Sequence, residues 1–185
     1  MTLTSSPAIA GFRLSPQQHR LWSLQQSAVQ LSTVAQAAIH ITGTLQANQL
    51  QSALLQVVQR HEILRTHFPC LPEMQMPLQV IETVDVDWLP DQDLRTLDAE
   101  TQAARLVASW HALAALDGLV RSQLLQLAEQ EWILHLALPS LSADGYTLRQ
   151  LVRELRDAYA NHPSVPKKEL PQYADLAEWQ HELLT

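Results

Sequence analysis

The chain has 185 residues, of which 46% are hydrophobic and 17% charged, and its formal net charge is -7. These values fit one globular domain, or one lobe of a larger domain, with a sizeable core. An acidic chain without a basic stripe argues against a nucleic-acid partner. The single cysteine, Cys70, excludes an intrachain disulfide and a cysteine-rich metal site, so we expect no metal and a reduced, cytoplasmic setting. Apolar runs such as Ile133 to Leu141 are too short to span a bilayer, and four glycines provide no glycine-rich phosphate loop.

The first predicted elements are a helix and a strand. Ser15 can act as an N-cap, Pro16 suits the first helical position, and Gln18 completes a capping box. The helix should end near Ser27. Residues 35–43 form the candidate strand.

A second helix should run from about Ala47 to Glu62, because four apolar residues and a histidine recur there at intervals of three and four and so share one face. These residues are Leu50, Leu54, Val57, Val58 and His61. We expect extended chain from Ile63 to Phe68, then an irregular proline-rich stretch. Residues 78–81 and 84–88 are further strand candidates.

The second half of the chain predicts a helix, a hairpin and two more helices. Residues 96–116 read as a long helix, and residues 119–127 and 132–138 as two antiparallel strands. Residues 146–159 form a clear amphipathic helix, and residues 173–184 a final short one. The expected core positions of the long helix are Leu106, Val107, Trp110 and Leu113.

This order predicts a mixed α/β fold in which helices cover a mostly antiparallel or mixed sheet. We expect three segments in the chain. Residues 1–11 are a loose leader, which together with Met1 indicates a natural N-terminus. Residues 12–160 form the folded lobe. Residues 161–185, with three prolines and two lysines before Gln172, form a linker and a crossover helix.

Two motifs point to a family. Residues 15–24 read Ser-Pro-Gln-Gln-His-Arg-Leu-Trp-Ser-Leu, and residues 60–66 read Arg-His-Glu-Ile-Leu-Arg-Thr. Alone, the first is an N-capped amphipathic helix and the second a charged helix end. In this order and spacing they resemble the first two core motifs of nonribosomal peptide synthetase condensation domains. The matching residues are Ser15, Gln18, Arg20 and Trp22 in the first motif, and Arg60, His61, Glu62 and Arg65 in the second.

The resemblance extends over nearly the whole chain from about Phe12. Residues 39–45, 116–121 and 172–180 also resemble family segments. Condensation domains consist of two lobes that resemble chloramphenicol acetyltransferase, with the active-site tunnel between them. The resemblance therefore implies that this chain is one such lobe and holds one wall of the tunnel.

The third family motif, His-His-x-x-x-Asp-Gly, is degenerate here. Residues 139–145 read Pro-Ser-Leu-Ser-Ala-Asp-Gly, so Asp144 and Gly145 remain while Pro139 and Ser140 replace the histidines. The resemblance implies that the second histidine orients or deprotonates the attacking amine. An unassisted serine is neither a base near pH 7 nor a cation. We therefore expect no catalytic residue in this loop.

Two residues are candidates for the catalytic role of the missing histidine. His135 lies five residues before Ser140, but strand alternation aims it away from the loop, and a core or edge histidine is the favoured reading. Ser140 as a nucleophile lacks a glycine elbow and an identifiable base. The resemblance also implies a structural ion pair between Arg65 and Asp144.

The remaining candidates favour ordinary structural roles. His61 and His67 lack the neighbouring ligands of a metal site. The aspartates around Trp88 read as a solvated loop, not as a calcium site. We expect Trp22, Trp110 and Trp179 to be packing residues.

We expect a degenerate, non-catalytic half condensation domain that acts as a structural or docking platform. Its partner would be an adenylation domain or a second lobe of the same synthetase, with self-association through an exposed inter-lobe face as a further possibility. The alternative is a fragment of a full domain that joins carrier-bound aminoacyl or acyl thioesters by an amide bond. A third reading is carrier-protein recognition near Arg121 and Arg149. The resemblance implies that no cofactor binds directly and that the phosphopantetheine arms of carrier proteins present the substrates.

Overall fold

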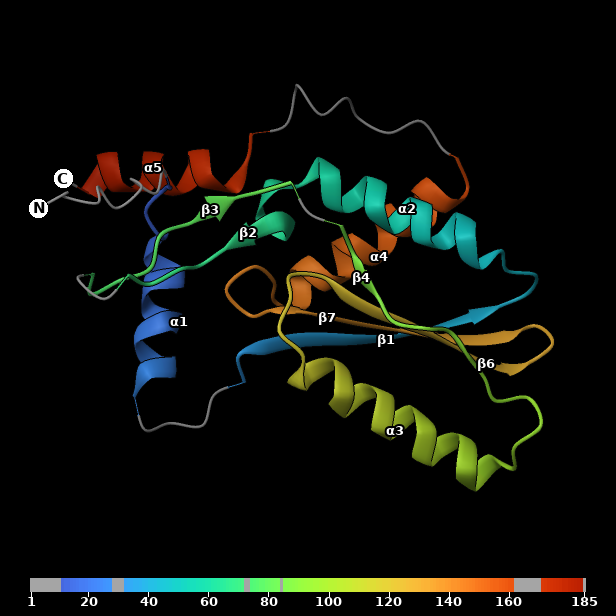
Figure 1. Ribbon diagram of the computed structural model, residues 1–185. Coiled ribbons are helices and arrows are strands. Elements are labelled where there is room, and N and C mark those ends of the chain that lie inside the picture. The colour runs from blue at the N-terminus through green and yellow to red at the C-terminus, as the bar shows by residue number, and fades with distance from the viewer. Residues whose placement is uncertain (1–10, 28–31, 72–73, 84, 162–170, 185) are drawn as a thin grey trace, which may run out of the picture.

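The computed structural model describes residues 11–27, 32–71, 74–83, 85–161 and 171–184. Its helices are α1 (Pro16–Gln26), α2 (Ala47–Arg60), the short 3-10 helix η1 (Glu62–Arg65), α3 (Ala99–Ala115), α4 (Gly145–Tyr159) and α5 (Tyr173–Leu184). Its strands are β1 (Val34–Thr42), β2 (Thr66–His67), β3 (Val80–Ile81), β4 (Asp87–Trp88), β5 (Gln92–Asp93), β6 (Arg121–Ala128) and β7 (Glu131–Pro139). The predicted mixed α/β class is confirmed (Figure 1).

The main sheet is mixed and is built around the β6–β7 hairpin. β7 pairs antiparallel with β6 on one side and with β1 on the other, while β4 and β5 add parallel to β6. β2 and β3 form a separate small sheet. The predicted hairpin is confirmed. Because Pro139 at the end of β7 pairs with Val34 at the start of β1, the sheet fixes where the following loop leaves it.

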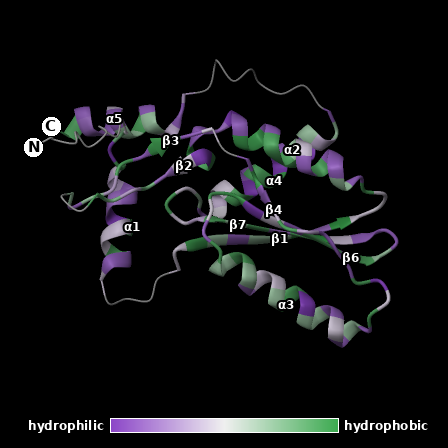
Figure 2. Cartoon of the chain, viewed as in Figure 1, coloured by the Kyte–Doolittle hydropathy of each residue, from purple (hydrophilic) through white to green (hydrophobic). Residues whose placement is uncertain are grey.

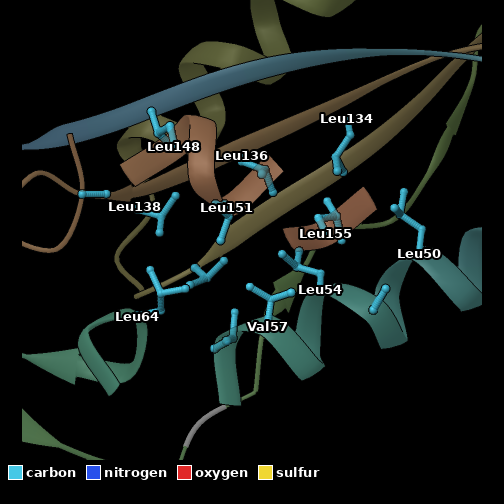
Figure 3. Packing of buried hydrophobic residues seen from close by; sticks show 14 of the residues in the cluster. Leu50, Leu54, Val57, Leu64, Leu134, Leu136, Leu138, Leu148, Leu151 and Leu155 are labelled. Atoms are coloured by element: carbon cyan, nitrogen blue, oxygen red, sulfur yellow. The ribbon is translucent and has the colours of Figure 1, made fainter. Parts of the chain in front are cut away.

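Helices α2 and α4 pack together on one face of this sheet, and the main core lies between them and the strands (Figure 3). Helix α2 is amphipathic, and the side chains on its apolar face form one side of the core (Figure 2). The most buried contributors, all at most 4% exposed, include Leu54, Val57, Leu134, Leu136, Leu138, Leu151 and Leu155. Each fully buried leucine stabilises the fold by about 1.5–3 kcal/mol. This packing holds the first turn of α4 next to the end of β7.

Helix α3 covers the opposite face of the sheet (Figure 1). Asp98 caps it by accepting a hydrogen bond from the Thr101 backbone N–H. Ser109 and Leu113 are its buried residues. The prediction that Val107 is a core residue was wrong, since its side chain is 57% exposed. Ser109 faces the sheet. Val107 lies about 200° around the helix axis from it and therefore points away from the sheet.

Helix α5 packs beside the start of α1 and returns the C-terminal end of the described chain to the N-terminal end (Figure 1). Arg13 donates from Nε and from its backbone N–H to the carboxylate of Glu178, at 2.9 and 2.8 Å. His181 Nε2 and the Leu14 carbonyl oxygen lie 2.7 Å apart.

Trp179, which was expected to be a packing residue, is 56% exposed within this chain. The inward face of α5 consists instead of Ala174 and Ala177, whose small side chains let the helix approach closely. The larger apolar residues Leu176, Trp179 and Leu183 are left outside.

Residues 63–68 also differ from the extended chain that was expected. The chain turns through η1 before the short strand β2. Thr66 Oγ1 donates to the Glu62 carbonyl oxygen at 2.7 Å, which stabilises the turn. Of the strand expected at residues 84–88, only Asp87–Trp88 forms, and Val84 lies outside the described residues.

Residues 1–10 of the predicted leader and residues 162–170 of the predicted linker also lie outside the described residues. Among the helices that are described, none combines the length and the apolar run that a bilayer span requires.

Candidate active-site loop

The degenerate third motif forms the loop between β7 and α4. Ser140 N–H donates to the Thr33 carbonyl oxygen at 2.8 Å, and the N–H groups of Ser142 and Ala143 both donate to the Pro139 carbonyl oxygen. These bonds fold the loop into a tight turn. It ends at Asp144, the N-cap of α4.

Asp144 is a capping residue in this structure. Its carboxylate accepts hydrogen bonds from Thr147 N–H at 2.8 Å and from Thr147 Oγ1 at 2.9 Å. These bonds lower the pKa of Asp144 below its ordinary value. Gly145 follows as the first residue of α4, where an added Cβ would meet nothing closer than Arg149 Nη1 at 3.8 Å. The Asp-Gly pair thus starts α4. The cap depends on the Asp144 carboxylate, whereas a side chain at Gly145 would meet no close neighbour.

The Ser140 hydroxyl is half-buried and held by helix α1. Gln25 Nε2 donates to Ser140 Oγ at 2.8 Å. The surrounding hollow has a volume of about 380 Å³ and is lined by Gln17, Gln18, Leu21, Ile63, Ser140, Leu141, Ser142, Ala143, Asp144, Thr147 and Tyr173.

Among the residues that the structure describes, the lining of this hollow offers Ser140 no free general base. Its lining includes two ionisable side chains, Asp144 and Tyr173. Asp144 caps α4, and the Tyr173 hydroxyl lies 2.8 Å from Ser15 Oγ. A serine accepting an amide N–H, without an adjacent base in the lining, is not an activated nucleophile.

The first motif anchors α1 to this loop. Ser15 and Gln18 form the predicted capping box, and Gln18 is only 4% exposed. Gln18 Nε2 donates to the Leu141 carbonyl oxygen at 3.0 Å and to Gln79 Oε1 at 3.3 Å. Trp22 is half-buried on α1, and Arg20 is exposed.

The second motif joins α2 to α4. Arg60 Nη1 lies 2.9 Å and His61 Nε2 2.8 Å from the same oxygen of Glu154. Glu62 N–H donates to Gln172 Oε1 at 3.0 Å, which connects the motif to the residue before α5. Arg60, His61 and Glu62 therefore connect three helices.

The predicted ion pair between Arg65 and Asp144 does not form among the described residues. Arg65 Nη2 instead lies 3.1 Å from Glu62 Oε1, and its Nη1 donates to the Glu82 carbonyl oxygen. Glu62 precedes Arg65 by three residues within the same turn, so this pair forms at a small entropic cost. Asp144 is occupied by Thr147.

His135 is a core histidine, as the favoured reading predicted. It is 3% exposed, its Nδ1 lies 2.9 Å from Ser109 Oγ, and it meets Trp110 edge to face at 5.6 Å. Burial lowers the pKa of His135. It faces α3, on the far side of the sheet from α4, and takes no part in the loop.

The carrier-recognition reading placed Arg121 on a surface, and that placement was wrong. Arg121 is 2% exposed and donates from Nη1 to the Leu116 carbonyl oxygen. Gly118 lies beside it with a φ of 145°, and an added Cβ there would clash with Asp87 Oδ2. Arg149, by contrast, is exposed.

Sequence reasoning missed three residues that shape the site: Gln25, Gln79 and Glu154. Gln25 carried a signal, since it lies seven residues after Gln18 and therefore on the same helical face. Glu154 is 94 residues from Arg60 and carried none. Among the described residues there is no group of three or more His, Cys, Asp or Glu side chains that could hold a metal ion.

The chain matches the condensation-domain family over residues 11–185. It belongs to the condensation-domain family of nonribosomal peptide synthetases.

Relatives among characterised synthetases are much longer than this chain. Chondramide synthase cmdD of Chondromyces crocatus is 37% identical over 183 residues, which is 91% of this chain and 5% of the relative. Malpibaldin synthetase of Mortierella alpina is 32% identical over 176 residues, covering 90% of this chain and 3% of the relative. The chain thus spans about a twentieth or less of these relatives.

Solved structures share the fold over part of their length. The X-domain from teicoplanin biosynthesis is 28% identical with a TM-score of 0.75, and covers 100% of this chain and 41% of its own. The EpoB cyclization-docking bidomain of Sorangium cellulosum is 30% identical with a TM-score of 0.73. The match covers 98% of this chain and 38% of the bidomain chain. The starter condensation domain of rhizomide synthetase RzmA, at 20% identity and a TM-score of 0.80, shows the fold alone.

Proposed function

We propose that this chain is a non-catalytic condensation lobe that serves as a docking platform in a nonribosomal peptide synthetase. The observation that carries the proposal is the Ser140 site. Where the family motif has its second histidine, this chain places a hydroxyl that accepts a hydrogen bond from Gln25 at 2.8 Å. An amine could not lose its proton to such a group at neutral pH. The retained Asp144 caps α4 and the second motif connects α2 to α4, and neither replaces the missing histidine.

The docking role draws support from the outer face of α5. Leu176, Trp179 and Leu183 are 43%, 56% and 65% exposed and lie along this face at spacings of three and four residues. A row of exposed apolar side chains on one helix face favours a docking surface. Of the structural neighbours, the X-domain is known in a complex with OxyB, and the EpoB structure pairs a cyclization domain with a docking domain. The partner here would be an adenylation domain or a second lobe of the same synthetase.

The docking role is tested by isothermal titration of this chain with each neighbouring domain of its synthetase. We expect saturable binding that is weakened at least tenfold by Trp179→Ser together with Leu183→Ser, because the apolar contact is lost. Arg105→Ala, an exposed change on α3, is the matched control. A chain that stays monomeric and binds none of its neighbours would sink the docking role.

A second candidate function is amide-bond formation between carrier-bound aminoacyl or acyl thioesters, with this chain as part of a complete domain. The intact second motif and the retained Asp144 and Gly145 favour it. Phosphopantetheine arms of carrier proteins would bring both substrates to the hollow at Ser140. This function requires catalysis by positioning alone. It predicts product formation by the intact synthetase with native Ser140, whereas the docking role predicts none.

A further inference from the structure

The solvent-facing side of α4 carries a positively charged ridge that the site above does not use. It consists of Tyr146, which is 63% exposed, and of the exposed residues Arg149 and Arg153. We call these three residues the α4 ridge. They lie three and four positions apart, so they share one face of the helix.

The charges of the α4 ridge are not balanced by its own helix. The acidic groups of α4 and its cap are engaged elsewhere: Asp144 with Thr147, Glu154 with Arg60 and His61, and Asp157 with Arg156. Within the described part of the chain, neither Arg149 nor Arg153 has a carboxylate oxygen within 4.0 Å. The ridge therefore presents two guanidinium groups to solvent.

A hollow of about 330 Å³ adjoins the ridge. It is lined by His61, Ile63, Leu64, Tyr146, Thr147, Gln150, Leu151 and Glu154. Ile63, Leu64 and Leu151 give it an apolar wall, and Tyr146 belongs to both hollow and ridge. Gln150 also connects the two, since it accepts a hydrogen bond from Arg153 Nη1 at 3.3 Å. A ligand could therefore contact the hollow and both arginines together.

We infer that the α4 ridge and this hollow bind an acidic segment of a partner protein. One apolar side chain of the segment enters the hollow, and two carboxylates about one helical turn apart pair with Arg149 and Arg153. The inference rests on the proposed docking function and specifies the chemistry of a partner. A formal net charge of -7 disfavours a long polyanion or an anionic membrane, because both would also meet the acidic remainder of the chain. A short segment meets only the local positive charge.

The test uses a fluorescent helical peptide with two glutamates four residues apart and a leucine beside them. A second peptide with glutamine in place of both glutamates is its control. Anisotropy titration of the complete chain at low salt should show saturable binding to the glutamate peptide, weakened by added salt. Arg149→Ala combined with Arg153→Ala should weaken that binding by about tenfold or more. Arg105→Ala on α3 should leave it unchanged, and both variants should keep the native circular dichroism spectrum.

Three results would overturn the inference: no saturable binding at low salt, equal binding of the glutamine peptide, or equal binding by the double arginine variant. Tighter, arginine-dependent binding to phosphatidylserine vesicles than to the glutamate peptide would also overturn it in favour of a lipid surface. None of these results bears on Trp179 or Ser140. Failure of the inference about the α4 ridge can thus be distinguished from failure of the proposed docking function. The titration with neighbouring domains tests the docking function separately.

Discussion

Glu154 organises the second motif although it lies outside it. One of its oxygens lies within 2.9 Å of both Arg60 Nη1 and His61 Nε2. The Arg60 side chain is only 15% exposed, so it depends on this partner more than a solvated arginine would. The family motif that the sequence displays is thus stabilised by a residue that the motif does not contain.

Replacing Glu154 with glutamine should lower the free energy of unfolding by about 1–2 kcal/mol, since Arg60 loses its charge-assisted partner. Urea denaturation measures the change. Glu129→Gln is the matched control, because Glu129 is 84% exposed and its contact with Arg95 should contribute less than about 0.5 kcal/mol. Equal stability of the two variants would contradict the role given to Glu154.

His135 should make the stability of the lobe depend on pH. Burial lowers the pKa of His135 in the folded chain, whereas the unfolded value is about 6.5. Its packed neighbours Ser109 and Trp110 bear no charge. The stabilising contribution is therefore complete above pH 6.5 and is lost as the pH falls through 6.5 towards the folded pKa, because only the unfolded chain takes up the proton.

Urea denaturation of the native chain and of His135→Gln between pH 8 and pH 5 measures this effect. The difference in unfolding free energy between the two proteins should shrink as the pH falls. Parallel pH profiles would show that His135 titrates alike in both states, against this expectation.

At the scale of elements, local signals were sufficient for most of the fold. The capping box of Ser15 and Gln18, the β6–β7 hairpin and the amphipathic pattern of α2 and α4 all depend on residues close in sequence, and the structure confirms each. Helix faces were harder to predict, because a face depends on what packs against it. Val107 and Trp179 are apolar residues whose neighbours cover other sides of α3 and α5.

The two faces of α3 provide a direct comparison. Leu113→Ala should lower the free energy of unfolding by about 2–5 kcal/mol, because Leu113 is fully buried and its removal leaves a cavity. Val107→Ala, on the same helix but 57% exposed, should change it by less than about 0.5 kcal/mol. Thermal or urea denaturation separates the two. Similar losses for both variants would contradict this assignment of the buried face of α3.

At the scale of the whole molecule, the motifs predicted the family, the single lobe and the degenerate loop. The contacts that complete the candidate site were beyond sequence reasoning. Gln25 reaches Ser140 across 115 residues, and Gln18 reaches Leu141 across 123. The ion pair between Arg65 and Asp144, which the resemblance implied, does not form among the described residues, because Glu62 pairs with Arg65 within the same turn. Distant pairs depend on the finished packing, which one sequence does not display.

The most direct test of the non-catalytic role is single-turnover amide-bond formation by the intact synthetase, with donor and acceptor carrier proteins loaded and the product detected by mass spectrometry. We expect no product above the background of the uncatalysed reaction from the native sequence with Ser140, and no change on Ser140→Ala. Product formed by the native synthetase at this domain, well above that background, would contradict the non-catalytic role and establish amide-bond formation as the function of the domain.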